Sequence, residues 1–576
     1  MTIDSDSLFV YAKPSESVRG VLKRMAVRGR RLSVLALICN ADNVLLGVAS
    51  QGDMLRLIAE GFDIDEPITN AMVGDPVTCP VGTDRETIIT IVRNQLRESN
   101  KTKNELTRFV PLVDRHGRVV DVCDVYESIA EMSHGHEYIA IYGMGFVGLT
   151  LAASLASRGH YVTGIDTNTQ LIDSLNSANV HIHEPRLKEV VRSSLNDGRL
   201  KFVNVPPDNH NRVVIFAVGT PVNEKEQADL KMIMSVAEDS ASKLRKGDLV
   251  ILRSTVPLGT TRSLILPILE GGSNLVAGRD FHLTFCPERT VEGSAMVELT
   301  SLPQIVGGLT ARCTEIAITF WQSLTDSVVK TESLEAAELV KLINNSFRDL
   351  SFAFANGVSL LADTYNIDAS RLIAAANEGY PRNSIPQPSP GVGGYCLTKD
   401  PYLYASFSPD SDYAKLSIQG RKTNEKAMHY PIEVVKKYCS QLGVDLSDMN
   451  ILLLGIAFKG WPQTNDTRGS TSLVVADELK RRTRSLYVYD SVIGKERIMG
   501  LGYIPYGLDG PVSKFDILLI LNNHPDNASI VENLVPNFIN RRGLIFDGWS
   551  MLDRFEVEKY QDLVYACMGY MTPNYQ

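Results

Sequence analysis

The fold of this chain is decided by the stretch Tyr138-Ile139-Ala140-Ile141-Tyr142-Gly143-Met144-Gly145-Phe146-Val147-Gly148. Its first five residues predict a β-strand, and three glycines follow with the spacing G-x-G-x-x-G. Residues 149–158 predict a helix and residues 161–166 a second strand, which Asp166 closes about twenty residues after the first glycine. A glycine turn between strand and helix, with a carboxylate ending the next strand, is typical of a dinucleotide-binding domain.

Each glycine of this motif, and the aspartate that follows it, has a physical role. Gly143 permits the tight turn, Gly145 lets a pyrophosphate approach the backbone at a helix N-terminus, and Gly148 lets the helix pack on the strand. Asp166 would accept hydrogen bonds from the adenosine ribose and repel a 2′-phosphate, so we expect NAD rather than NADP. The predicted cofactor-binding residues of the motif are Gly143, Gly145, Phe146, Val147, Gly148 and Asp166.

Further strands with polar loops at their carboxyl ends extend the same predicted sheet. The strands are expected at 213–218, 249–253 and 282–285. The loops that follow them contain Thr220, Pro221, Ser254, Thr255, Glu288 and Arg289. Open parallel sheets bind ligands at this edge, so we expect these side chains to surround one site.

The next part of the chain predicts a long helix followed by a glycine-rich loop with a single cysteine. Residues 335–365 have helical apolar spacing, and Lys341 and Asn345 are four residues apart, on one helical face. The loop 379–400 ends in Gly393-Gly394-Tyr395-Cys396-Leu397-Thr398-Lys399-Asp400. A nearby lysine should lower the pKa of the Cys396 thiol and make it a nucleophile, while a carboxylate could orient or deprotonate water.

Strand and helix patterns alternate again after residue 445, with strands expected at 450–454, 486–490, 516–521 and 544–546. The fold class predicted is therefore α/β: two Rossmann-like doubly wound domains joined by a helical core, preceded by an α+β module. The expected domains are residues 1–133, 134–330, 331–445 and 446–576.

The first module contains an internal repeat of a β-β-α pattern. Strands are expected at 33–39 and 44–49 with a helix at 51–61, and again at 109–113 and 119–123 with a helix at 124–132.

Composition excludes several classes of function. The 576 residues are 44% hydrophobic and 22% charged, and the net charge of −9 with a pI near 5.7 does not favour nucleic acid or anionic membranes. No apolar run is long enough to span a bilayer and no signal peptide is evident. The eight cysteines form no CxxC or CxxH pair, so we expect no metal site and a reduced, cytoplasmic protein.

From about residue 138 to 570 the chain resembles the UDP-glucose/GDP-mannose dehydrogenase family of nucleotide-sugar 6-dehydrogenases. The resemblance rests on ordered motifs: the dinucleotide fingerprint, Thr220-Pro221, Ser254 to Thr261, Cys286-Pro287-Glu288-Arg289, the group Glu338, Lys341 and Asn345, Gly393 to Cys396 with Lys399-Asp400, and Phe458-Lys459 with Asp466, Arg468 and Ser470. It implies oxidation of a sugar C6 alcohol to a carboxylate by two NAD⁺ in turn, in a homodimer or higher homo-oligomer.

The resemblance also implies roles for individual residues. Cys396 would hold the aldehyde as a thiohemiacetal and then as a thioester, Lys341 and Asn345 would stabilise the oxyanion, Glu288 would act as a base and Asp400 would orient water and Lys341. Further cofactor-binding residues would be Thr220, Pro221, Ser254, Thr255 and Lys399. Substrate-binding residues would be Glu288, Arg289, Lys341, Asn345, Arg382, Gly393, Phe458, Lys459 and Arg468, with Arg382 reaching a neighbouring subunit and Arg468 contacting phosphate or pairing with Asp466.

The N-terminal repeat resembles a pair of cystathionine-β-synthase-type (CBS) modules. The match is Gly47 to Asp53, and Ser50 and Asp53 would face a regulatory nucleotide. The alternative is a scaffold or oligomerisation module without a ligand.

Departures from the family pattern leave the substrate open. The usual Val-Pro-Thr-Pro reads Val218-Gly219-Thr220-Pro221, the usual Asn-Glu reads Asn356-Gly357, and Tyr395 replaces the histidine of the N-acetylhexosamine branch. Other segments, such as Pro381-Arg382 and Pro390 to Gly394, resemble that branch. We therefore favour a UDP-N-acetylhexosamine (GlcNAc or ManNAc) over UDP-glucose. The other classes considered are a non-catalytic nucleotide-sugar sensor and a dehydrogenase of small hydroxy acids.

Overall fold

The computed structural model describes residues 9–27, 35–50, 54, 62–83, 87–88, 91, 109–124, 137–206, 212–223, 226–325, 327–508, 514–560 and 562–573. Met1–Gly135 and His136–Gln576 form two compact units, and each is considered by itself. Within the described ranges, no helix is long and apolar enough to cross a membrane.

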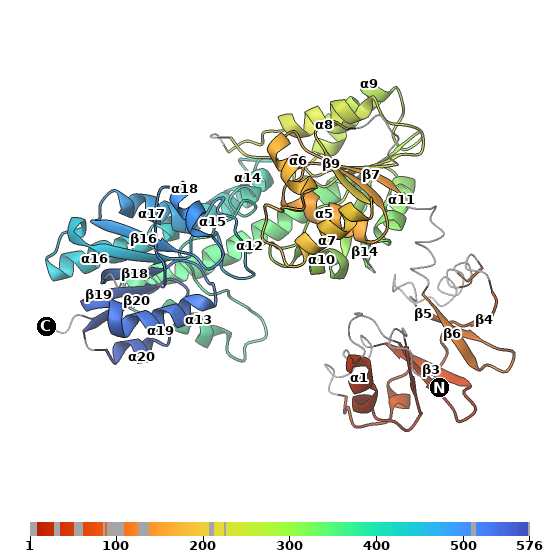
Figure 1. The fold of residues 1–576 in the computed structure, drawn as a ribbon, viewed down its shortest axis with the longest axis horizontal. Coiled ribbons are helices and arrows are strands. Elements are labelled where there is room, and N and C mark those ends of the chain that lie inside the picture. Colours follow the sequence, from red (N-terminus) through yellow and green to blue (C-terminus); the bar gives the residue numbers. More distant parts are fainter. Residues whose placement is uncertain are drawn as a thin grey trace. The chain divides into compact units, whose positions relative to one another are not determined.

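The N-terminal unit consists of two three-stranded halves of the same topology (Figure 1). The first half contains β1 (Phe9–Ala12), α1 (Val18–Val27), β2 (Leu35–Cys39), β3 (Leu45–Ser50) and a 3₁₀ turn at Ile68–Asn70; the second contains β4 (Cys79–Pro80), β5 (Phe109–Val113) and β6 (Val119–Asp124). In each half a parallel pair adjoins an antiparallel hairpin, so the predicted repeat is present in the strands. The helices predicted at 51–61 and 124–132 lie outside the described residues, apart from residues 54 and 124.

An eight-stranded sheet opens the second unit, in the order β14-β13-β12-β11-β10-β7-β8-β9. Its strands are β7 (Tyr138–Tyr142), β8 (Tyr161–Ile165), β9 (Leu200–Val203), β10 (Val213–Phe216), β11 (Leu249–Leu252), β12 (His282–Phe285), β13 (Gln304–Gly308) and β14 (Val328–Lys330). Only the β12–β13 pair is antiparallel. The order of β9 to β12 is that of a doubly wound dinucleotide fold, with the strand order reversing between β7 and β10.

Both faces of this sheet are buried, which explains why its strands are continuously apolar. In β10, Val213 and Ile215 pack into the core of one face, while Val214 and Phe216 pack into the core of the other. The surrounding helices are α5 (Phe146–Ser157), α6 (Thr169–Asn176), α7 (Leu187–Asn196), α8 (Lys231–Ala241), α9 (Leu266–Ser273) after a π-turn at Thr261–Ile265, α10 (Ala295–Ser301) and α11 (Ala311–Trp321).

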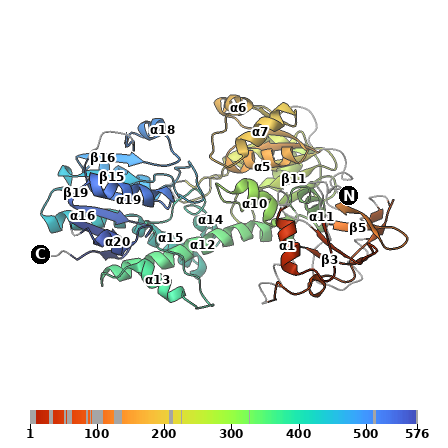
Figure 2. The same cartoon turned by 60° about the horizontal axis from the view of Figure 1, so that its bottom comes forward.

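The central helices follow, with α12 (Leu334–Asp363) as the longest (Figure 2). Ser333 caps its N-terminus by accepting a hydrogen bond from the backbone of Ala336. The other helices of this core are α13 (Ala369–Asn377), α14 (Asp400–Ala405) and α15 (Asp412–Met428), and both α14 and α15 pack against α12. The cysteine loop lies between α13 and α14, so these helices fix both of its ends.

The last sheet has seven strands in the order β17-β16-β15-β18-β19-β20-β21. Its strands are β15 (Asn450–Leu454), β16 (Ser485–Tyr489), β17 (Ile504–Pro505), β18 (Phe515–Ile520), β19 (Ile539–Asp547), β20 (Leu563–Cys567) and β21 (Tyr570–Met571); its helices are α16 (Tyr430–Leu442), α17 (Thr471–Lys480), α18 (Lys495–Gly500), α19 (Asp526–Phe538) and α20 (Arg554–Glu558), with a 3₁₀ turn at Leu446–Asp448. The predicted fold class, with two doubly wound sheets joined by a helical core, is confirmed.

Candidate active site

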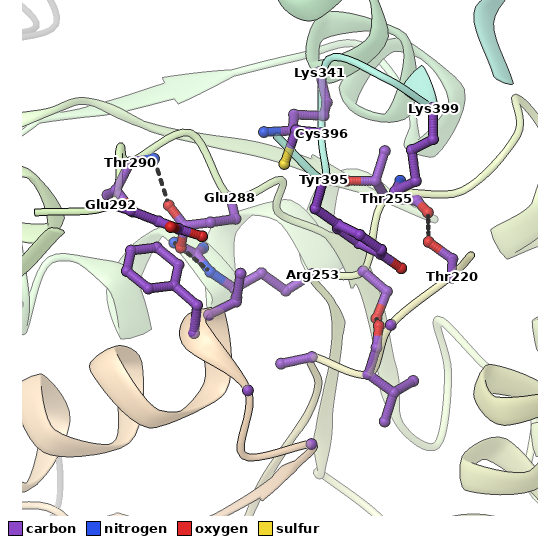
Figure 3. A pocket seen from close by; sticks show the side chains of 18 of the residues that line it. Thr220, Arg253, Thr255, Glu288, Thr290, Glu292, Lys341, Tyr395, Cys396 and Lys399 are labelled. Atoms are coloured by element: carbon purple, nitrogen blue, oxygen red, sulfur yellow. Dashed lines mark hydrogen bonds and ion pairs between the residues drawn. The ribbon is translucent and has the colours of Figure 1, made fainter. Parts of the chain in front are cut away.

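A cavity of about 880 Å³ collects most of the residues singled out from the sequence. Its walls come from the loops after β7, β10, β11 and β12, from α12, from the cysteine loop and from the loop after β15 (Figure 3). The predicted site residues on its walls are Gly143, Gly145, Phe146, Val147, Asp166, Thr220, Ser254, Thr255, Glu288, Arg289, Lys341, Asn345, Gly393, Cys396, Lys399, Phe458, Lys459 and Arg468.

The glycine loop has the geometry that a dinucleotide needs. Gly143 has φ +93°, and a Cβ there would lie 2.8 Å from the Ala217 carbonyl oxygen. A Cβ at Gly148 would lie 1.8 Å from the Gly143 carbonyl oxygen, so helix and turn pack without room for a side chain. Gly145 instead has no heavy atom within 4 Å of its would-be Cβ. This open space beside the start of α5 fits a closely approaching pyrophosphate.

Asp166 stands at the carboxyl end of β8 and faces the cavity. One carboxylate oxygen accepts a hydrogen bond from the Met144 backbone at 2.8 Å, and the other accepts one from Asn168 at 3.0 Å. These contacts fix the carboxylate beside the glycine loop, where an adenosine ribose would bind.

The loops after β10 and β11 are tied to each other. The Thr220 hydroxyl donates to the Thr255 carbonyl oxygen, and the Ser254 hydroxyl donates to the Val218 carbonyl oxygen at 2.7 Å. Thr220, Ser254 and Thr255 line the cavity, whereas Pro221 is not among the lining residues. These two hydrogen bonds hold the loops after β10 and β11 together as one wall of the cavity.

The polar residues of α12 and the cysteine loop are joined through a buried carboxylate. Asp400 accepts a hydrogen bond from the Asn345 amide at 2.5 Å and pairs with the Lys399 ammonium at 2.6 Å. Asp400 is completely buried and does not line the cavity. It therefore positions Asn345 and Lys399, and the expectation that it orients the reacting water is not supported by this placement.

Cys396 is exposed, and it lines the cavity. Figure 3 shows its sulfur beside the amino group of Lys341. Burial raises the pKa of the Cys396 thiol and outweighs the opposing charges of Lys341 and Lys399. The surroundings thus raise the pKa of the Cys396 thiol, contrary to the lowering expected from the sequence.

Glu288 is paired with Arg253 and not with its neighbour Arg289. Arg253 donates to one Glu288 carboxylate oxygen through two nitrogens, at 2.9 and 2.5 Å, inside the protein. The other oxygen accepts from the Arg289 and Thr290 backbones, each at 2.7 Å. Burial raises the pKa of Glu288, but the Arg253 charge and the Thr290 backbone outweigh it, and the pKa lies below its ordinary value. Such a carboxylate is a weak base.

The C-terminal wall of the cavity is held by ion pairs. Arg468 pairs with Asp466 at 2.6 Å, the alternative weighed from the sequence. The Lys459 ammonium donates to the Glu292 carbonyl oxygen at 2.6 Å, and burial lowers the pKa of Lys459 to about 8. At Gly394, a Cβ would lie 2.7 Å from the Phe458 ring, so the cysteine loop is packed directly on this wall.

Arg382 is the predicted substrate residue that lies apart from the cavity wall. It is exposed, stacks over the Tyr380 ring at 4.9 Å and donates to the Tyr380 hydroxyl at 3.1 Å. Its role in a neighbouring subunit stays a prediction.

In the N-terminal unit, Ser50 ends β3 and Asp53 lies outside the described residues, so the nucleotide prediction also stays open.

A buried network behind the cysteine loop escaped the sequence reasoning. Arg421 on α15 donates to the carbonyl oxygens of Leu397 at 3.1 Å and Val392 at 3.0 Å, on either side of Cys396. Asp349 on α12 pairs with Arg421 at 2.7 Å and accepts from Asn424 at 2.8 Å. The network anchors the loop to two helices.

The wall residues that the sequence reasoning did not assign to the site include Arg253, Glu292 and Tyr395. The signal for Arg253 was a charge at the end of an otherwise apolar strand, which predicts a buried partner. Burial, together with Asp466, raises the pKa of Glu292 to about 7.

A dinucleotide fold and a cysteine beside a lysine in one cavity define a dehydrogenase with a covalent step. The UDP-glucose/GDP-mannose dehydrogenase family matches with its NAD binding domain at residues 137–325, its central domain at 335–426 and its UDP binding domain at 452–554. The chain belongs to this family. It is an NAD-dependent nucleotide-sugar dehydrogenase with a UDP-sugar-binding domain, as predicted.

Individual relatives align with this chain over almost their whole length. The UDP-N-acetyl-D-mannosamine dehydrogenase of Campylobacter jejuni is 34% identical over 69% of this chain and 98% of its own. An NDP-N-acetyl-D-galactosaminuronic acid dehydrogenase of Ralstonia solanacearum is 32% identical over 67% of this chain and 90% of its own. Among solved structures, the UDP-D-ManNAc dehydrogenase of Pyrococcus horikoshii has 29% identity and a TM-score of 0.66, over 75% of this chain and 99% of its own.

Proposed function

We propose that this protein oxidises the C6 alcohol of a UDP-N-acetylhexosamine, N-acetylmannosamine or N-acetylglucosamine, to the uronate. The observation that carries the proposal is one cavity in which Cys396, Lys341 and Asn345 share walls with the glycine loop and with Phe458, Lys459 and Arg468. The names of the Campylobacter and Pyrococcus relatives support the N-acetylhexosamine.

When bound, NAD⁺ supplies the hydride acceptor for each of the two oxidations. Gly143, Gly145, Phe146, Val147 and Asp166 would hold it, with Thr220, Ser254, Thr255 and Lys399 lining the same cavity, whereas Gly148 packs the helix on the turn and does not line the cavity. Pro221 would only shape its loop.

The residues beside Cys396 divide the remaining chemistry. When the C6 alcohol loses a hydride to the cofactor and its hydroxyl proton to solvent water, it becomes the aldehyde, and Lys341 and Asn345 stabilise the negative charge that develops on its oxygen. The Cys396 sulfur adds to the aldehyde carbon while the carbonyl oxygen takes a proton, and oxidation of this thiohemiacetal leaves a thioester. Water then attacks the thioester, the C–S bond breaks, and uronate, thiol and a proton are released. Glu288 is a weak base, so we assign it to holding the water, with Asp400 fixing Asn345 and Lys399.

The stoichiometry of the reaction tests the proposal. With UDP-ManNAc or UDP-GlcNAc, two NADH should form per sugar consumed. Cys396→Ser should form no uronate, whereas the half-exposed Cys123→Ser should turn over as the unchanged protein does. A ratio of one, or uronate formation by Cys396→Ser at the original rate, would refute the covalent step.

UDP-glucose is the second candidate substrate, and Tyr395 in place of histidine is the observation that favours it. Comparison of kcat/KM for UDP-glucose, UDP-GlcNAc, UDP-ManNAc, UDP-galactose and GDP-mannose decides between them. A larger value for UDP-glucose would overturn our choice.

We also propose that the protein is a homodimer formed through α12. Phe347, Phe354 and Leu361 recur every seven residues on this helix and are 70%, 61% and 66% exposed. Leu416 of α15 is 60% exposed, and α15 packs beside α12. An apolar stripe of this kind fits a second copy of the same helix. Arg382 would then meet the substrate of the other subunit.

The N-terminal unit is proposed to bind a nucleotide near Ser50. Titration calorimetry of the full chain with ATP, ADP, AMP and S-adenosylmethionine should give binding that Ser50→Ala weakens. Absence of heat with all four, or equal affinity in Ser50→Ala, would leave the unit a scaffold.

All eight cysteines are free, which supports our assignment of the protein to the reducing cytoplasm.

A further inference from the structure

Two departures from the family sequence pattern, Gly219 and Tyr395, touch each other in the structure. A Cβ at Gly219 would lie 3.4 Å from the Tyr395 hydroxyl oxygen and 3.6 Å from the Met232 methyl carbon. Gly219, Met232 and Tyr395 all line the cavity. A side chain at residue 219 that extends beyond Cβ towards Tyr395 would therefore meet the phenol.

The Tyr395 ring is held in this place by two cations. The Arg468 guanidinium lies 4.9 Å and the Lys399 ammonium 5.4 Å from the ring centroid. Each cation is itself fixed, Arg468 by Asp466 and Lys399 by Asp400, both at 2.6 Å. Cation–π contacts of this kind favour one ring position, so the tyrosine is a built part of the wall.

The direction of the ring decides what its hydroxyl can meet. Figure 3 shows the ring running from the cysteine loop towards Thr220 and Thr255, which belong to the cofactor wall. Burial raises the pKa of Tyr395, so its hydroxyl is neutral at neutral pH and can both donate and accept. The dinucleotide must extend from Asp166 towards Cys396, because the carbon held by the thiol is the one that is oxidised. Its nicotinamide half then reaches Tyr395.

We infer that Tyr395 is a cofactor-binding residue that hydrogen-bonds to the carboxamide or ribose of the nicotinamide half, and that Gly219 is small because Tyr395 needs its space. The two sequence departures are thus one structural feature: a glycine makes room for a tyrosine. The inference requires NAD as cofactor, and it does not depend on which sugar is oxidised.

Direct binding measurements test the hydroxyl. Tyr395→Phe keeps the ring between Arg468 and Lys399 and removes the oxygen alone. Loss of one hydrogen bond should weaken NADH binding about two- to tenfold in a fluorescence titration without sugar. Binding of the UDP-sugar, measured by calorimetry, should stay within about twofold, since the substitution keeps the ring and its cation contacts and removes only an oxygen that faces the cofactor wall. Unchanged NADH affinity, or an equal loss for the sugar, would overturn the inference.

A double-mutant cycle tests the shared space. Gly219→Val should push the phenol aside and weaken NADH binding, and Gly219→Val/Tyr395→Phe should bind no worse than Tyr395→Phe. The coupling expected for residues in contact is a factor of at least about two. Strictly additive effects would show that the two positions are independent and would overturn the pairing.

The matched control is Gly271→Val, a glycine of α9 with no atom within 4 Å of its would-be Cβ. It should leave NADH affinity unchanged. Should Gly219→Val not fold, Gly219→Thr replaces it in the same cycle, because its side chain also extends beyond the Cβ that would lie 3.4 Å from the Tyr395 hydroxyl. NADH affinity is measured without turnover, so failure here is distinct from failure of the proposed reaction.

Discussion

At the scale of single residues, burial and charge oppose each other around the reacting groups. Burial raises the pKa of the Cys396 thiol despite the charges of Lys341 and Lys399. The pKa of Glu288 lies below its ordinary value, because the Arg253 charge and backbone N–H groups outweigh the effect of burial. The thiol must lose its proton during the reaction, with the Lys341 charge beside it to favour that loss.

Alkylation of Cys396 should report its raised pKa. The inactivation rate with iodoacetamide should increase with pH and reach its midpoint above that of a free thiol, because only the thiolate reacts. Lys341→Met should move the midpoint higher still. Peptide mass spectrometry at each pH identifies the alkylated cysteine, and a midpoint near neutral pH would contradict the prediction.

The Arg253–Glu288 pair should govern stability in a pH-dependent way. Arg253→Met leaves a buried charge unpaired and should cost about 3–5 kcal/mol of unfolding free energy at pH 8. The pKa of Glu288 is then raised by burial, so the deficit should shrink as pH falls towards the unfolded value of about 4.3. In the unchanged protein the sign is opposite: its depressed pKa gives stability that is lost only as pH falls through it.

Thermal melts at pH 8 and pH 5 check this reversal. Arg253→Met/Glu288→Gln, which removes both charges, should recover part of the stability at pH 8. A deficit for Arg253→Met that is equal at both pH values would show that the lost packing against Trp321 dominates.

At the scale of secondary-structure elements, two helices hold the reactive loop. Cys396 stands on a loop without regular structure, yet Arg421 of α15 and Asp349 of α12 fix the backbone on both sides of it. The loop is thereby as well positioned as the helices themselves.

Arg421→Lys tests this clamp. The lysine keeps the ion pair with Asp349 but loses the fork that reaches Val392 and Leu397. Misplacement of the thiol should lower kcat by about a hundredfold. NADH binding should weaken less than kcat falls, because the glycine loop keeps its place and only Tyr395 and Lys399 move with the cysteine loop. The readout is kcat together with NADH titration, and Lys422→Arg on the exposed side of α15 is the matched control. Unchanged kcat in Arg421→Lys would show that Arg421 does not position Cys396.

At the scale of the whole molecule, three sets of residues far apart in the chain meet in one cavity, and the exposed stripe on α12 remains to be covered. Phe354→Glu places a charge in the middle of the stripe and should convert the dimer into monomers in sedimentation velocity runs. Phe407→Glu, an exposed aromatic outside the stripe, should leave the dimer intact. A dimer that survives Phe354→Glu would place the interface elsewhere.

Much of the site could be predicted because local patterns carry it. The glycine spacing with Asp166, the helix with Lys341 and Asn345, and the loop with Cys396 are each contained in a short stretch. The fold class followed from alternating strands and helices, whose burial on both sheet faces requires continuous apolar runs. Glu288, by contrast, was expected from the family resemblance to act as a base, and nothing in its own stretch indicates its partner Arg253, which follows β11 while Glu288 follows β12.

The sequence by itself determined the two doubly wound sheets, the NAD-binding domain and the loop that brings Cys396 to the cavity, since periodicity and short motifs encode them within one element or one turn. Only the tertiary structure decided the pKa of Cys396, the pairing of Glu288 with Arg253, the burial of Asp400 and the meeting of Gly219 with Tyr395. These depend on which atoms surround a group after segments far apart in the chain have packed together, and desolvation and contact are properties of that packing.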